Sequence, residues 1–163
     1  MTHLATDPLT LIHTAISLAA ILTGLPVLAA MLKGTLPITL TGIFLALTVL
    51  TSVTGFFFHN TTITPAMIVG AISLVLLAVA LFALYGQHLA GFWRTAFVIT
   101  ATLALYLNVF VLVIQSFIKI PALHALAPTI PPAGPVFGAV QGVVLIAFLL
   151  AGWRAVKSGR ASP

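Results

Sequence analysis

Five long apolar segments dominate the chain, and they constrain its fold more than any other feature. Each holds roughly 20 residues, which as a helix rising 1.5 Å per residue crosses the ~30 Å hydrocarbon core of a bilayer. Continuous apolar runs predict helices, because lipid offers no partners to backbone N–H and C=O groups. The expected helices cover about residues 9–32, 37–58, 65–85, 92–118 and 136–153.

The composition excludes a soluble fold. Hydrophobic residues make up 61% of the 163 residues and charged residues only 4%, whereas a soluble domain carries about 25% charged residues. Seven charged side chains, six basic and one acidic, are too few to cover the surface of a soluble domain. We therefore predict a single all-α transmembrane domain over residues 1–163, an integral membrane bundle of five transmembrane helices. Residues 154–163 are expected to form a short basic tail.

The basic residues predict how the bundle is oriented. Five crossings place the two termini on opposite sides of the membrane. Basic side chains accumulate on the cytoplasmic side of membrane proteins, so we expect the N-terminus outside and the C-terminus inside. The C-terminal side holds Lys33, Arg94, Arg154, Lys157 and Arg160, and the N-terminal side holds Lys119.

The residue types that are missing exclude several classes of function. The chain has no Cys, and its one acidic residue is Asp7. Disulfides, thiolate metal sites and paired-carboxylate catalysis are therefore excluded within one chain, as are carboxylate-rich Mg²⁺ or Ca²⁺ sites. No set of nucleophile, base and orienting group is readable, so no enzyme activity is predicted. The basic residues form no phosphate-tracking stripe, which favours membrane lipid over nucleic acid as a partner.

Three histidines are expected at the outer end of the bundle. His13 lies near the start of the first span, His59 ends the second, and His124 lies in the connection after the fourth. Helical stripes of small residues lead to the first two, so the first two helices are expected to face each other with their imidazoles at one height. These stripes are His13, Ser17, Ala20 and Gly24 on one helix and Thr48, Ser52, Gly55 and His59 on the other.

Imidazole binds haem iron, copper and zinc. The first hypothesis is therefore a binding or redox module in which His13 and His59 hold a haem b or, as a second choice, a Cu or Zn ion. His124 would be a third ligand or a capping group. The simpler alternative is that the small residues only pack helices, while histidines at the interface meet water and headgroups.

Polar residues of the fourth span support a second hypothesis. Asn108, Gln115 and Lys119 are spaced i, i+7 and i+11 and so share one helical face, and Tyr106 is a further polar position. An amide inside the membrane needs a partner. These residues either make interhelical hydrogen bonds or line a ligand cavity or pathway, which indicates a small-solute transporter or channel.

A glycine series at the start of the fifth span supports a third hypothesis. Gly134, Gly138 and Gly142 form a GxxxGxxxG pattern, which is typical of close helix packing in membranes. This face would pack within the bundle, in a homodimer or in a larger membrane complex. The protein would then be a non-catalytic accessory subunit that docks through this helix or through residues 119–135.

Two phrases carry a resemblance to known proteins. Residues 105–128, with the Gly55-Phe-Phe-Phe-His59 ending of the second span, resemble small multispan integral membrane proteins of bacteria that have no assigned activity. This resemblance implies location in the bacterial inner membrane. A fainter similarity to His-bearing, b-type-cytochrome-like membrane proteins rests on His13 and Lys33-Gly34. The chain departs from that pattern at residues 38–41, where Ile-Thr-Leu-Thr replaces a His-Arg pair.

Overall fold

The computed structural model describes residues 7–58 and 63–159. These residues form helices and turns and contain no strand. Among them, five helices are long and apolar enough to cross a membrane, which confirms the all-α prediction and its five apolar helices. They are Pro8–Leu32, Ile38–Phe57, Pro65–Gly86, Phe92–Lys119 and Pro135–Ser158.

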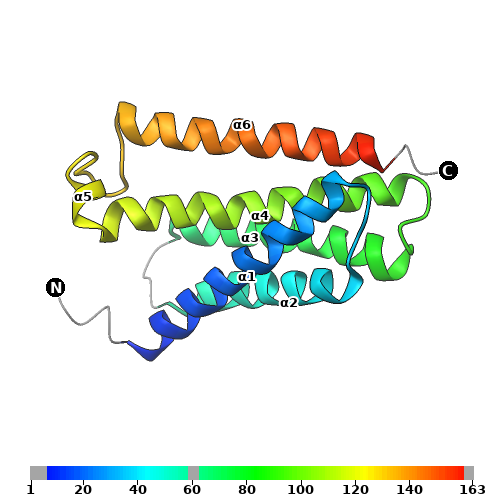
Figure 1. The fold of residues 1–163 in the computed structure, drawn as a ribbon. Helices are drawn as coiled ribbons and strands as arrows, with labels where there is room; N and C mark the ends of the chain where they lie inside the picture. Colours follow the sequence, from blue (N-terminus) through cyan, green and yellow to red (C-terminus); the bar gives the residue numbers. More distant parts are fainter. Residues whose placement is uncertain (1–6, 59–62, 160–163) are drawn as a thin grey trace.

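The elements follow the chain in a simple order (Figure 1). Two of the spans end in a change of helical pitch: α2 tightens into the 3₁₀ turn η1, and α3 widens into the π-helical turn η2. A short helix, α5, lies in the long connection before the last span. The bounds are α1 Pro8–Leu32, α2 Ile38–Thr54, η1 Gly55–Phe57, α3 Pro65–Leu81, η2 Phe82–Gly86, α4 Phe92–Lys119, α5 Pro121–His124 and α6 Pro135–Ser158.

Local sequence explains where the helices begin. Asp7 caps α1, because its carboxylate accepts a hydrogen bond from the backbone N–H of Thr10 at 3.2 Å. Thr64 caps α3 in the same way, with its hydroxyl 3.3 Å from the N–H of Met67. A proline takes the first helical position after each cap, where its missing N–H costs nothing.

The last helix is longer than the sequence predicts. We expected it to end near residue 153, but α6 continues to Ser158, so residues 154–158 of the expected tail are helical. The basic side chains Arg154 and Lys157 suit this position, because cations near a helix C-terminus interact favourably with its dipole. The ammonium of Lys157 also lies 4.1 Å from the ring centre of Trp153, which stabilises the last turns.

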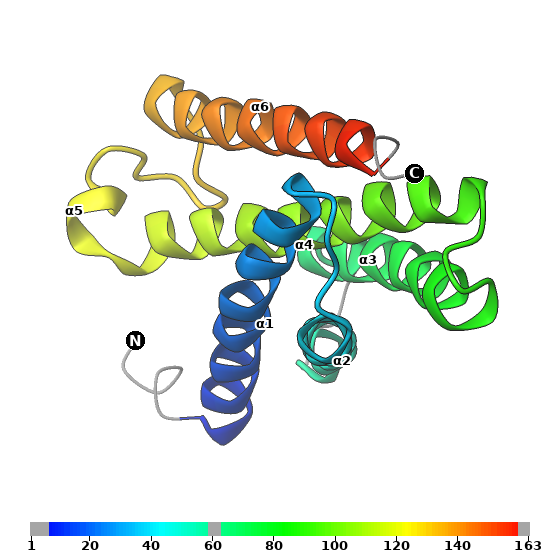
Figure 2. The same ribbon diagram turned by 45° about the vertical axis from the view of Figure 1, so that its right-hand side comes forward.

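The bundle is packed tightly at one end and opens at the other. The buried residues of α1 lie in its second half, between Ala20 and Met31, and those of α4 lie almost entirely between Ala96 and Leu105. In Figures 1 and 2 the first turns of α1 diverge from the last turns of α4. Gly24 lies at the crossing, since a Cβ there would be only 2.6 Å from Leu105 Cδ1.

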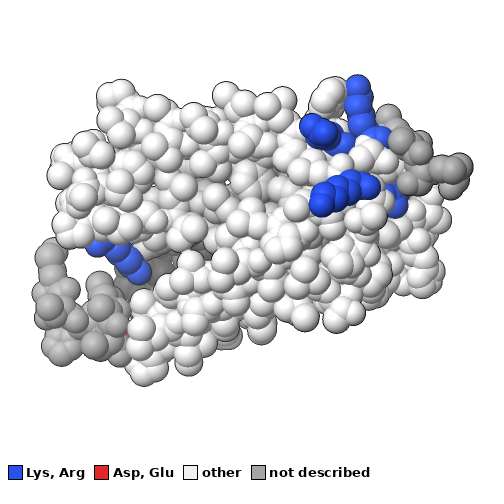
Figure 3. Space-filling model, viewed as in Figure 1, with Lys and Arg blue, Asp and Glu red and all other residues white. Residues whose placement is uncertain are grey.

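The described basic residues lie at the two ends of the bundle. Figure 3 shows blue side chains gathered where α4 begins and α6 ends, and further blue at the opposite end. We call the first the basic end, defined by Lys33, Arg94, Arg154 and Lys157. The opposite end holds Lys119 and is called the His13 end, because α1 begins there.

The last span packs loosely on the rest of the bundle. Only Gln141 and Ala155 of α6 are buried. A Cβ added at Gly134, Gly138 or Gly142 would meet nothing within 4 Å, and Gly134, the residue before α6, has a φ of 109°. The glycine face of α6 therefore has no packing partner within the described part of the chain.

Candidate ligand site at the His13 end

His13 is held between the start of α1 and the end of α2. Its Nδ1 lies 2.8 Å from Oγ1 of Thr54, and its ring packs edge-on against Phe58 with ring centres 5.2 Å apart. A Cβ added at Gly55 would lie 3.7 Å from His13 Cε1. At this end, the small-residue stripes of the two helices therefore face each other.

The hydroxyl of Thr54 decides which nitrogen of His13 carries the proton. Thr54 Oγ1 lies 2.7 Å from the carbonyl oxygen of Leu50, to which it donates its only proton. With that proton donated to Leu50, Nδ1–H of His13 is the donor to Thr54. Neutral His13 then carries its lone pair on Nε2, which is how metal-binding imidazoles are commonly oriented.

The orienting group is Thr54 and not the single carboxylate of the chain. Asp7 accepts hydrogen bonds from the backbone N–H and the hydroxyl of Thr10, both at 3.2 Å, and so serves to cap α1. Sequence reasoning missed Thr54, because threonines of membrane helices usually bond to their own helix. Thr54 does bond to its own helix, but only as a donor, and its oxygen remains available to His13.

Of the other two histidines expected at this end, the structure describes only one. His59 lies outside the described residues. His124 ends α5 and is half-buried, and its Nδ1 is buried without a hydrogen-bond partner in the described structure. Within residues 7–58 and 63–159, no three His, Asp or Glu side chains are grouped so as to hold one metal ion.

Asn108 points from α4 toward α2. Its Nδ2 lies 3.5 Å from Oγ1 of Thr48, a long hydrogen bond, and Thr48 itself donates to Phe44 O at 2.8 Å. Asn108 thus makes the interhelical hydrogen bond that the simpler interpretation requires. Every side chain of α4 from Tyr106 to Ile114 is half-buried.

Gln115 and Lys119 extend this polar face of α4 toward the His13 end. Both are exposed, and with Asn108 they span an arc of about 40° around the helix. This face of α4 is therefore directed at Thr48 of α2 in mid-span, and it continues to the His13 end of the bundle, where α4 ends at Lys119.

Tyr106 is not brought to this face. Its ring packs against Phe148 of α6, with ring centres 5.7 Å apart, and against Phe110 one turn along α4 at 6.0 Å. Tyr106 therefore contributes to the contact between α4 and α6, on a different side of the helix from Asn108.

Comparison with known proteins adds nothing to this geometry. No family model, curated protein or solved structure matches the chain.

Proposed function

We propose that the protein is a binding or redox module of the bacterial inner membrane, with its N-terminus outside, that holds its ligand at the His13 end. His13 and His59 would bind a haem iron or, as a second choice, a Cu or Zn ion. The observation that carries the proposal is the hydrogen bond from His13 Nδ1–H to Thr54, which leaves Nε2 as a ligand. A bound haem or copper ion would accept and pass on single electrons.

The surroundings of His13 support this proposal. The chain has no thiolate, and its one carboxylate caps α1, so imidazole is the only strong ligand type for such a metal. Gly55 leaves room beside the ring, and Phe58 supplies an apolar wall. His124, with its unpartnered Nδ1, is the third or capping group of the proposed site.

The test is a visible spectrum and a metal analysis of the protein purified in detergent. We expect a Soret band, or bound Cu or Zn, that is lost in His13→Ala and in His59→Ala. His88→Ala is the matched control, because His88 is exposed in the turn between η2 and α4, at the basic end. A colourless, metal-free protein that takes up neither haemin, Cu²⁺ nor Zn²⁺ would refute the proposal. An equal loss of the Soret band or of bound metal in His88→Ala would also refute it.

A second candidate function is a pathway for a small anionic solute. The polar face of α4 favours it, because Asn108 lies in mid-span and Lys119 is exposed at the end of the same helix. Acetate flux into proteoliposomes is the measurement. We expect flux that falls in Asn108→Leu but not in Gln87→Leu, which alters an amide outside this face. Flux no faster than in protein-free liposomes would exclude the pathway.

A further inference from the structure

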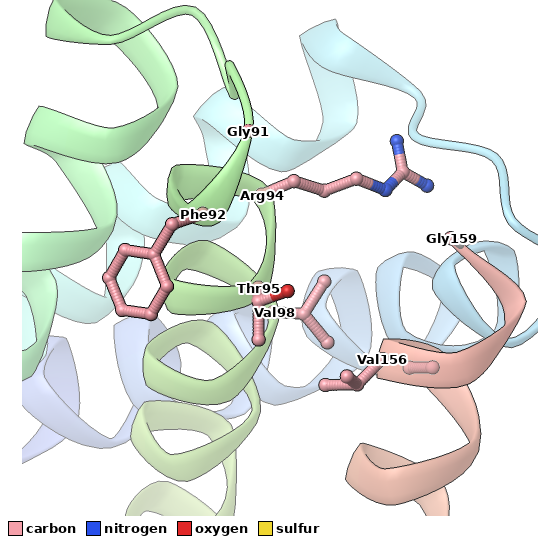
Figure 4. A pocket seen from close by; sticks show the side chains of 8 residues that line it. Gly91, Phe92, Arg94, Thr95, Val98, Val156 and Gly159 are labelled. Atoms are coloured by element: carbon pink, nitrogen blue, oxygen red, sulfur yellow. The ribbon is translucent and has the colours of Figure 1, made fainter.

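A cavity of about 360 Å³ lies at the basic end, away from the proposed His13 site. It separates the start of α4 from the end of α6. Gly91, Arg94, Thr95 and Val98 line it from the α4 side, and Val156 and Gly159 line it from the α6 side. Figure 4 shows Arg94 reaching from α4 across toward Gly159.

The guanidinium of Arg94 is fixed in place and only partly satisfied. Its Nη2 donates to the carbonyl oxygen of Gly34 in the turn after α1, at 3.1 Å. The Arg94 side chain also packs so closely on Gly159 that a Cβ there would collide with it. Nε is buried without a hydrogen-bond partner in the described structure. A guanidinium has five N–H donors, so unused donors remain beside the cavity.

No acidic side chain lies at the basic end to neutralise this charge. Its only acidic residue, Asp7, caps α1 at the opposite end. Lys33, Arg154 and Lys157 add further positive charge at the basic end. A partly buried charge without a partner is unfavourable, so Arg94 is suited to bind an anion supplied from outside the chain.

We propose that this cavity binds the phosphate of an anionic phospholipid, with Arg94 as the principal donor and the Thr95 hydroxyl as a second one. A planar guanidinium matches the oxygens of a phosphate. The ligand is a lipid and not free phosphate, because the cavity lies at the end of two spans, at headgroup level. Phe92, also at its edge, is 73% exposed, and Val98 and Val156 provide apolar walls beside an acyl chain.

The experiment measures lipid binding to the full-length protein in detergent by native mass spectrometry. Phosphatidylglycerol is the probe, phosphatidylcholine the neutral lipid for comparison, and inorganic phosphate the free anion. We expect about tenfold preference for phosphatidylglycerol over phosphatidylcholine, and little binding of inorganic phosphate.

Three variants separate the cavity from diffuse surface charge. Arg94→Gln removes the charge, and Val156→Phe fills the cavity while leaving the bond from Arg94 to Gly34 intact. Each is expected to weaken phosphatidylglycerol binding about tenfold. Arg154→Gln removes a charge at the same end but outside the cavity, and is expected to change binding less than about twofold.

The outcomes are decisive even where Arg94→Gln does not fold, because Val156→Phe keeps the arginine. Unchanged binding in Val156→Phe would overturn the proposal. So would equal weakening in Arg154→Gln, since that would indicate only the summed charge of the basic end. Inorganic phosphate that binds as tightly as phosphatidylglycerol would overturn the lipid as the ligand.

Discussion

Nδ1 of His13 and Oγ1 of Thr54 lie 2.8 Å apart and join the start of α1 to the end of α2. Because the proton of Thr54 is donated to Leu50, the threonine acts on His13 only as an acceptor. A neutral hydroxyl therefore orients the imidazole without adding charge to an apolar region. This makes Thr54 a positioning residue for any ligand held by His13.

Replacing Thr54 by Val removes the acceptor at almost constant volume. We expect Thr54→Val to lower haem or metal affinity by about 10- to 100-fold, the usual effect of removing an outer partner of a ligating histidine. Thr54→Ser keeps the hydroxyl and should bind like the parent protein. The measurement is a titration with haemin or Zn²⁺, and equal affinity of Thr54→Val and the parent would show that Thr54 does not orient the ligand.

Gly24 is the position where α1 tolerates no side chain. A Cβ there would lie 2.6 Å from Leu105 Cδ1 and 2.8 Å from the ring of Phe44, both buried in the core. We expect Gly24→Ala to destabilise the bundle by about 1–3 kcal/mol, the usual cost of overpacking. Gly138→Ala is the control, because a Cβ there meets open space. Unfolding titrations in mixed detergent would contradict the prediction if the two variants were equally stable.

Ser158 forms a hydrogen bond between the end of α6 and the end of α1. Its hydroxyl lies 2.7 Å from the carbonyl oxygen of Met31 and 3.0 Å from that of Ala155. We expect Ser158→Ala to cost about 0.6 kcal/mol, the average for interhelical hydrogen bonds in membranes. Ser116→Ala is the matched control, because Ser116 donates to Leu112 of its own helix. A smaller loss in the unfolding free energy for Ser158→Ala than for Ser116→Ala would contradict this role.

The absence of cysteine makes the orientation directly measurable. Ile63, before α3, is 76% exposed, and Thr35 is exposed in the turn after α1 at the basic end. We expect a membrane-impermeant maleimide to label Ile63→Cys in spheroplasts, and Thr35→Cys only after the membrane is disrupted. The reverse pattern would place the N-terminus inside.

The glycine face of α6 is the surface that we propose for a homodimer or a larger membrane complex. Because Gly138 and Gly142 face open space within the chain, Gly138→Leu and Gly142→Leu should leave the fold of one copy unchanged. We expect either variant to shift a dimer to monomer in analytical ultracentrifugation in detergent, since bulky side chains prevent close helix approach. A parent protein that is already monomeric would exclude the homodimer.

The sequence alone was sufficient for the five apolar helices and for most of their ends. Lipid requires an apolar run to satisfy its backbone internally, so length and hydropathy predict a helix whatever its neighbours are. Asp7 and Thr64 mark helix starts because capping involves only three or four consecutive residues. The end of α6 differs from the prediction, because Arg154 and Lys157 end the apolar run but, as cations, favour the last turn of a helix.

The tertiary structure decided how these helices meet, and with it the candidate sites. The contact of His13 with Thr54 depends on the packing of α1 against α2, and the divergence of α1 from α4 toward the His13 end depends on their crossing at Gly24. The Arg94 cavity is lined by residues of α4 and α6 that lie about 60 positions apart in the sequence. No helical period relates such residues, because their distance is determined by the angles at which whole helices pack and not by the local pattern of either helix.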